Sequence, residues 1–236
     1  MTGMPSNSRT AFIFDMDGVL TDTMRFHADS WVELFKDYGL EGLDARRYLV
    51  ETAGMKGLDV LRYFLDPDIS VAEAERLTEL KDFLYRVKSR DLIKPMPGLP
   101  EFLLAADKRD IRLGIGTGAG PRNIDYVLDL LKLTDRFQAI VNPHHVPNGK
   151  PHPDIFLRAA ELLEVDPSAC IVFEDAIPGV EAARKAGMKC VAVTTTNSAE
   201  AFSSFPNIIR IIDDFRELSV DDLCTLIHKK QPATLL

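Results

Sequence analysis

Asp15 and Asp17 stand one residue apart, directly after the short apolar run 12–14 and just before Gly18. A run of this length suits a buried strand better than a helix, and a glycine lets the chain turn sharply after it. Two carboxylates so close repel each other unless a cation lies between them or one of them holds a proton. Carboxylate oxygens suit Mg²⁺, so the motif predicts a metal site. For a motif this short, the alternative is a solvated turn rich in aspartate.

Thr117 and Gly118 stand at the end of a second expected strand, residues 111–117. A hydroxyl group followed by a glycine-supported turn can offer an O–H and an N–H to one phosphate oxygen. The alternative for Thr117 is that it caps the helix that follows.

Lys150 stands in the loop after a third expected strand, residues 137–141, between Gly149 and Pro151. A lysine placed in this way could neutralise a phosphoryl group during its transfer, whereas the alternative is a loop lysine that faces solvent. Histidines in the same loop could bind a metal ion, although hard oxygen ligands fit the expected site better. They are His144, His145 and His152.

Glu174 and Asp175 follow a fourth expected strand, residues 169–173. These two acids could complete a Mg²⁺ site that faces Asp15, or they could cap the next helix. Parallel strands expose their carboxyl ends at one edge of a sheet, which is where ligands bind in open α/β proteins. The polar ends of these strands, taken in order, therefore predict one site for Mg²⁺-assisted phosphoryl transfer.

Strands and helices alternate from Pro97 onward, which predicts a parallel sheet with helices on both faces. Besides the strands already named, we expect strands at 189–193 and 208–212, and helices at 123–133, 153–164 and 180–186. Residues 24–92 instead show helical patterns, at 26–38, 57–65 and 70–87, without a convincing strand. The apolar stripe expected on the last of these helices comprises Leu77, Leu80, Leu84 and Val87.

The fold class that follows is α/β, with a Rossmann-like parallel sheet core and an α-helical block inserted after the first strand. We expect the core at 10–22 and 94–230, the helical insert at 23–93, and loose termini at 1–9 and 231–236.

Composition and charge limit the partners of the chain. The 236 residues carry a net charge of −8, which disfavours nucleic acid and anionic membranes because both bind basic surfaces. No apolar run approaches the length of a membrane span, and residues 1–9 lack the apolar core of a signal peptide. Widely spaced cysteines, odd in number, fit neither a disulfide framework nor a zinc site and favour a reducing, cytoplasmic setting. They are Cys170, Cys190 and Cys224, the first two in apolar runs typical of a core.

Several stretches of the sequence resemble the haloacid dehalogenase superfamily, and within it the β-phosphoglucomutase-like phosphatases. They are FIFDMDGVLTDT, LGIGTG, GKPHPDIF and VFEDAIPGVEAARKAGM, and the resemblance extends over residues 10–215. It implies that Asp15 is the nucleophile, which forms an aspartyl-phosphate, and that Asp17 is the general acid and base. It implies further that Thr117 and Lys150 hold the phosphate. The Mg²⁺ ligands that it implies are Asp15, the backbone carbonyl of Asp17, Asp175 and, directly or through a neighbour, Glu174.

The resemblance implies that the helical insert, residues 23–93, is the family's small α-helical cap domain, which selects the substrate and whose motion closes the site and excludes water. His27 matches a histidine near the reacting centre of the mutases, and the alternative is an exposed residue on the first cap helix. Residues 53–57 align with the mutase loop that holds an arginine against a second phosphate, but Gly57 occupies the arginine position here. Gly54 and Lys56 are the substrate contacts expected in this segment, and the alternative for Lys56 is a solvated side chain.

These observations predict a Mg²⁺-dependent phosphatase that acts on a small phosphorylated metabolite such as a sugar phosphate. The missing arginine and the length of segment 117–133 favour this function over a β-phosphoglucomutase-type transfer between sugar hydroxyls. A further alternative is a catalytically silent binding protein with the same fold. The residues that argue against it are Asp15, Asp17, Lys150 and Asp175.

Overall fold

The computed structural model describes residues 9–52, 55 and 57–228. By the contacts between Cα atoms, the chain divides into two compact units, Met1–Thr21 with Pro95–Leu236, and Asp22–Lys94. We call the first the core unit and the second the cap unit. Within the described ranges, every helix is too short or too polar to cross a lipid bilayer.

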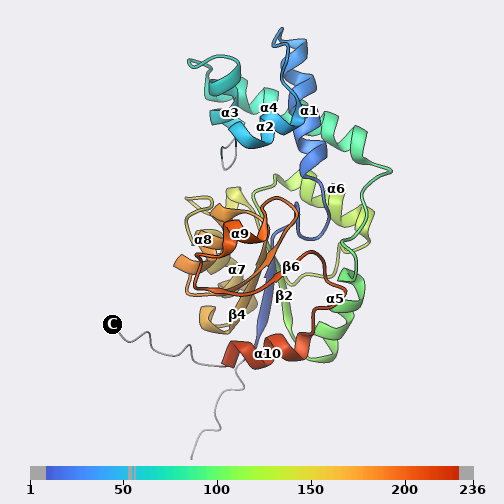
Figure 1. The fold of residues 1–236 in the computed structure, drawn as a ribbon, viewed down its shortest axis with the longest axis vertical. Helices are drawn as coiled ribbons and strands as arrows, with labels where there is room; N and C mark the ends of the chain where they lie inside the picture. Colours follow the sequence, from blue (N-terminus) through green and yellow to red (C-terminus); the bar gives the residue numbers. More distant parts are fainter. Residues whose placement is uncertain (1–8, 53–54, 56, 229–236) are drawn as a thin grey trace, which may run out of the picture. The chain divides into compact units, whose positions relative to one another are not determined.

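The core unit is built on a parallel sheet (Figure 1). Within the described residues its strand order is β3-β2-β1-β4-β5-β6. The strands are β1 (Ala11–Phe14), β2 (Arg112–Gly116), β3 (Ala139–Val141), β4 (Cys170–Glu174), β5 (Lys189–Val193) and β6 (Ile208–Ile212). From β1 the chain moves to β2 and β3 on one side, and later to β4, β5 and β6 on the other. Ligand sites of such sheets lie at this reversal, beyond the carboxyl ends of the strands.

The helices of the core unit agree with the sequence only in part. They are α5 (Leu99–Lys108), α6 (Pro121–Leu131), α7 (Asp154–Leu163), α8 (Ile177–Lys185), α9 (Ala199–Phe202) and α10 (Val220–His228). α6, α7 and α8 lie where helices were expected, whereas α5, α9 and α10 have no counterpart in the prediction. A signal for α5 is nevertheless present, because Leu99, Phe102, Leu103 and Ala106 recur at helical spacing and are buried.

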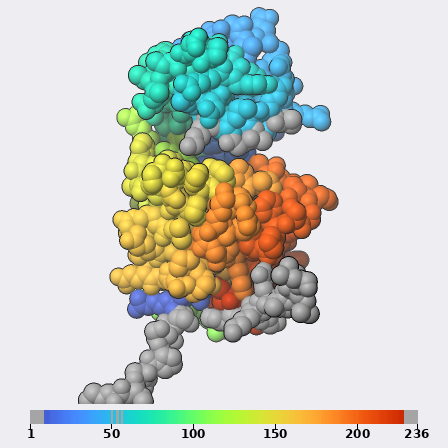
Figure 2. Space-filling model, turned by 90° about the vertical axis from the view of Figure 1, so that its left-hand side faces the viewer, coloured from blue at the N-terminus to red at the C-terminus, as the bar shows by residue number. Residues whose placement is uncertain are grey.

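Helices cover both faces of the sheet because the side chains of β1 alternate between two apolar layers. On one face, Phe12 stacks on Phe102 of α5 with ring centroids 5.6 Å apart, and Phe14 stacks on Phe173 of β4. On the other face, Ile13 belongs to an apolar cluster that includes residues of α7 and α8. These two helices contribute to the surface of the core unit that Figure 2 shows in yellow and orange. The predicted α/β fold is confirmed.

Every helix or strand among the described residues of the cap unit is a helix, as the sequence predicted. Its helices are α1 (Met24–Asp37), α2 (Ala45–Glu51), α3 (Gly57–Phe64) and α4 (Val71–Ser89). α2 has no counterpart in the prediction. Trp31 and Phe35 of α1 stack with ring centroids 5.4 Å apart and pack against Leu61 of α3 and Leu77 of α4 in one apolar cluster. This cluster is the hydrophobic core of the cap unit.

The apolar stripe predicted on α4 is partly wrong. Two of its members, Leu80 and Val87, are 39% and 60% exposed. The helix instead turns Lys81 inward, which is only 6% exposed. Burial of this lysine is possible because its stem is apolar and its Nζ atom lies 2.5 Å from Oδ1 of Asp82 and 5.3 Å from the centroid of the Trp31 ring.

Candidate active site

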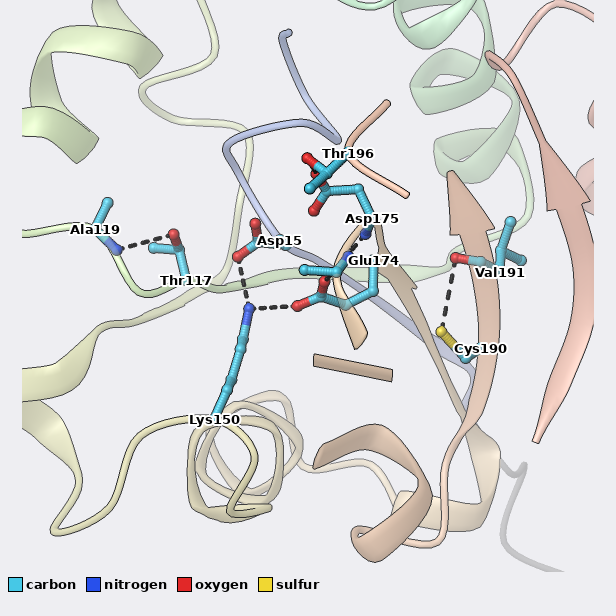
Figure 3. Close-up of polar contacts among 10 residues, drawn as sticks. Asp15, Thr117, Ala119, Lys150, Glu174, Asp175, Cys190, Val191 and Thr196 are labelled. Atoms are coloured by element: carbon cyan, nitrogen blue, oxygen red, sulfur yellow. Dashed lines mark hydrogen bonds and ion pairs between the residues drawn. The ribbon is translucent and has the colours of Figure 1, made fainter. Parts of the chain in front are cut away.

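Asp15 follows β1 directly and is buried at the carboxyl edge of the sheet (Figure 3). Its backbone N–H donates a hydrogen bond of 2.9 Å to the carbonyl oxygen of Phe173 on β4. The ladder between β1 and β4 therefore continues as far as the aspartate and fixes its backbone. Because β2 and β4 flank β1, the residues that end these two strands are the neighbours of Asp15 in space.

The Nζ atom of Lys150 lies between two carboxylates, 2.6 Å from Oδ1 of Asp15 and 2.5 Å from Oε1 of Glu174 (Figure 3). It also lies 5.0 Å from the centroid of the Phe156 ring. That ring has room because a glycine faces it, since a Cβ atom on Gly116 would stand 2.9 Å from Cδ1 of Phe156. Lys150 is therefore held within the core unit, and the alternative of a solvent-facing loop lysine is wrong.

Glu174 is the last residue of β4 and is buried. Its Oε2 atom accepts hydrogen bonds from the N–H groups of Asp175 and Ala176, at 3.0 and 3.1 Å. Ala176 is the N-cap residue of α8, so the carboxylate lies at the positive end of that helix. Glu174 therefore stabilises the start of α8 and pairs with Lys150 at the same time.

Asp175 is held by residues of the loop after β5, which sequence reasoning missed. Oγ1 of Thr196 donates to Oδ2 of Asp175, and Oγ1 of Thr195 lies 3.3 Å from the same oxygen. Nδ2 of Asn197 donates to the carbonyl oxygen of Asp175 at 3.0 Å. The run of hydroxyl and amide side chains at 194–197, after another strand end, is the signal that could have identified them.

Burial dominates the ionisation of this cluster. It raises the pKa of Asp15 to about 7, although Lys150 acts in the opposite direction and Glu174 raises this pKa further. Burial, followed by the charges of Glu174 and Asp15, raises the pKa of Asp175 well above its ordinary value. Burial alone would lower the pKa of Lys150, but its two carboxylate neighbours outweigh this effect and the pKa is raised. The ionised cluster therefore holds more negative charge than its lysine can balance.

Three buried acids could hold a metal ion at this position. Asp15, Glu174 and Asp175 each offer a carboxylate oxygen, and these oxygens all lie within 4.8 Å of one another. Hard oxygen donors with excess negative charge fit a hard divalent cation such as Mg²⁺. Among the described residues, this group includes no histidine of the loop that follows β3.

The other predicted site residues of the core unit lie just after β1 and β2. Asp17 is half-buried in the turn that follows β1. Thr117 is buried, and its Oγ1 atom accepts a hydrogen bond of 3.1 Å from the N–H of Ala119. Because the N-cap residue of α6 is Gly120, Thr117 stabilises the turn before this helix and does not cap the helix itself. Gly118 is exposed in the same turn.

The predicted substrate contacts of the cap unit are His27, Gly54 and Lys56. Gly54 and Lys56 lie outside the described residues. His27 is half-buried. Its ring stacks on that of Tyr85 with centroids 3.9 Å apart, and its Nδ1 atom lies 3.2 Å from Nζ of Lys81. The alternative of an exposed residue on α1 is therefore wrong.

Comparison with known proteins identifies the family. The family model described as haloacid dehalogenase-like hydrolase matches residues 10–187 of the chain. The β-phosphoglucomutase of Bacillus subtilis is 32% identical over 78% of this chain and 82% of that protein. The fructose-1-phosphate phosphatase of Escherichia coli is 32% identical over 77% of this chain and 94% of that protein.

A solved structure shows the same similarity. The HAD hydrolase of family IA, variant 3, from Entamoeba histolytica has a TM-score of 0.87 and 27% identity, over 93% of this chain and 100% of that chain. The family match spans the site residues from Asp15 to Asp175, whereas the loop after β5 lies beyond it. The chain therefore belongs to the haloacid dehalogenase-like hydrolase family, as a phosphatase or phosphoryl-transfer enzyme of the β-phosphoglucomutase-like type.

Proposed function

We propose that the chain is a Mg²⁺-dependent phosphatase that hydrolyses a small phosphorylated metabolite, such as a sugar phosphate. One observation carries the proposal, namely that Lys150 reaches Asp15 and Glu174 at 2.6 and 2.5 Å in a buried, strongly acidic site. Such a site suits a carboxylate nucleophile, a placed cation and a metal ion acting on one phosphoryl group. The similarity to a fructose-1-phosphate phosphatase supports the substrate class.

Asp15 is the nucleophile in this proposal. An oxygen of its carboxylate attacks the phosphorus atom, the bond from phosphorus to the substrate oxygen breaks, and an aspartyl-phosphate forms. Asp17 gives its proton to the departing substrate oxygen. Water then attacks the same phosphorus atom and gives a proton to Asp17, the bond between phosphorus and the Asp15 oxygen breaks, and inorganic phosphate leaves.

Thr117, Gly118 and Lys150 bind the phosphoryl oxygens. The hydroxyl of Thr117 and the backbone N–H of Gly118 follow β2, which is the neighbour of the strand that carries Asp15. Lys150 supplies positive charge where the transferred group becomes more negative. When phosphate binds, the ammonium group would exchange its contact with Asp15 for one with the phosphate. Its contact with Glu174 would hold it in the site during this exchange.

Asp15, the carbonyl oxygen of Asp17, and Asp175 are the proposed Mg²⁺ ligands. When bound, the ion supplies positive charge that weakens the repulsion between the carboxylate nucleophile and the phosphate. Both oxygens of Glu174 accept hydrogen bonds, one from Lys150 and the other from two N–H groups. Glu174 is therefore proposed either as a further ligand or as a residue that acts on the ion through these neighbours.

The cap residues His27, Gly54 and Lys56 are proposed to contact the part of the substrate that is not transferred. A second function, phosphoryl transfer between sugar hydroxyls, is favoured by the similarity to a β-phosphoglucomutase. We prefer hydrolysis because Gly57 stands at the position where the mutases hold a second phosphate with an arginine.

The test is phosphate release from a panel of sugar phosphates and other small phosphoesters, with Mg²⁺ and with EDTA. β-Glucose 1-phosphate is included with and without glucose 1,6-bisphosphate. Mg²⁺-dependent release of inorganic phosphate from one or a few compounds would support the proposal. Conversion of glucose 1-phosphate to glucose 6-phosphate with little free phosphate would establish the mutase instead, and release that EDTA does not affect would refute the role of the metal.

A further inference from the structure

Consecutive side chains of the loop after β5 contact the acidic site, and the mechanism proposed above uses none of them. Oγ1 of Thr195 donates a hydrogen bond of 2.6 Å to the carbonyl oxygen of Gly18, in the turn that follows Asp17. Oγ1 of Thr196 donates to Oδ2 of Asp175, and Figure 3 shows these two side chains next to each other. The loop thus connects two segments that carry proposed metal ligands, although 177 positions separate Thr195 from Gly18.

Gly18 makes this contact possible. Its φ angle is +81°, and a Cβ atom there would lie 2.0 Å from Oδ2 of Asp175 and 3.1 Å from Oγ1 of Thr195. The turn after β1, the end of β4 and the loop after β5 therefore meet around one carboxylate oxygen. A side chain at position 18 would therefore displace this oxygen.

The orientation of the Asp175 carboxylate needs such contacts. The χ2 torsion of an aspartate has a broad energy profile, so the covalent structure alone does not determine where its two oxygens point. A hydroxyl that donates to Oδ2 selects one orientation. Figure 3 shows the other oxygen of Asp175 on the side of Asp15, toward the space between the acids.

We propose that Thr195 and Thr196 are positioning residues, which orient Asp175 and the turn after Asp17 for binding of the metal ion. This inference rests on the proposed Mg²⁺-dependent function. Neither threonine touches the substrate in this proposal, and both act through the residues that they hold. Partners of this kind usually change metal affinity by about 10- to 100-fold when they are removed.

The experiment measures Mg²⁺ affinity by isothermal titration calorimetry, which needs no turnover. Thr→Val removes the hydroxyl and keeps the shape of the side chain. We expect the double variant Thr195→Val, Thr196→Val to bind Mg²⁺ about tenfold more weakly or worse. Thr194→Val is the matched control, because Oγ1 of Thr194 contacts the carbonyl oxygen of Ile212 and Oδ1 of Asp213. It should keep the wild-type affinity.

Two further measurements separate positioning from damage to the fold. The double variant Thr195→Ser, Thr196→Ser restores the hydroxyls and should restore the affinity. At saturating Mg²⁺, kcat of the valine variant should return close to the wild-type value, which a misfolded site would not show. Wild-type affinity in the valine variant, or an equal loss in Thr194→Val, would overturn the inference. A wild-type protein that binds no Mg²⁺ would instead refute the proposed function itself.

Discussion

A Cβ atom on Gly179 would lie 1.8 Å from Oε1 of Glu174, so only a glycine at this position of α8 leaves room for the Glu174 side chain. Gly179→Ala is therefore expected to push Glu174 away from Lys150 and from the N-terminus of α8. Overpacking of this kind lowers stability by about 1–3 kcal/mol. We expect urea titrations to show a loss of this size, and kcat to fall by about 100-fold as Lys150 is displaced.

A double-mutant cycle separates this contact from a general effect of alanine in α8. In a Glu174→Ala background, the side chain that alanine would displace is absent. The added loss of stability from Gly179→Ala should then fall below about 1 kcal/mol. An equal loss in both backgrounds would show that the contact with Glu174 is not the cause.

Asp15→Asn removes the proposed nucleophile, and Asp17→Asn removes the proposed general acid and base. We expect the first variant to release no phosphate above background, and the second to lose about 10²–10⁴-fold in kcat. Mass spectrometry after an acid quench should find a phosphoryl adduct on the wild-type protein and none on Asp15→Asn. Asp135→Asn, at an exposed position, is the control and should keep wild-type turnover. Full turnover by Asp15→Asn would rule out its role as the nucleophile.

Burial of Asp15 makes the metal-free protein less stable as the pH rises. The pKa of this carboxyl rises from 3.8 to about 7 on folding. Its stabilising contribution is therefore complete below 3.8, declines as the pH increases, and is lost above about 7. With EDTA present, the urea midpoint should be lower at about pH 8 than at about pH 5. Added Mg²⁺ should raise the midpoint more at the higher pH, because the ion then displaces no proton.

Asp15→Asn is the control for this pH dependence, since asparagine does not titrate. In EDTA, the decline of stability between the two pH values should be smaller in the variant than in the wild type. Lys150 does not contribute in this range, because its ordinary pKa of 10.5 keeps it charged in the unfolded protein and its raised pKa keeps it charged in the folded protein. An identical decline in both proteins would mean that other groups cause it.

The sheet and the position of its acidic residues could be predicted because both depend on local patterns. β5 and β6 coincide with the expected ranges 189–193 and 208–212, each a short and mostly apolar run bounded by turn residues. Once the strands are parallel, the residues that follow them must share one edge, and the structure brings Asp15, Lys150 and Asp175 together there. What these residues do in catalysis is a proposal that the variants above test.

Contacts between distant segments could not be predicted in this way. Hydroxyl residues follow many strands without any role, and only the folded chain places Thr195 and Thr196 against Gly18 and Asp175. α4 shows a different limit. Hydrophobic periodicity assumes that apolar residues face inward, and it takes no account of the partners that allow Lys81 to be buried.

Trp31 reports on unfolding of the cap unit, because it is the one tryptophan of the chain and lies in the core of this unit. Lys81→Met keeps an unbranched side chain but removes the charge that lies 2.5 Å from Asp82. The carboxylate of Asp82 then stays largely buried without this partner, which should lower the stability of the cap unit by about 2 kcal/mol. The measurement is urea unfolding followed by tryptophan fluorescence.

Lys88→Met is the matched control on the same helix. Lys88 pairs with Glu33, and the two side chains are 38% and 41% exposed. An ion pair this exposed contributes about 0–1 kcal/mol, so its removal should leave the fluorescence midpoint nearly unchanged. The difference between the two variants then measures what burial adds to the pair of Lys81 and Asp82. If both variants lost the same stability, burial would add nothing to the pair of Lys81 and Asp82.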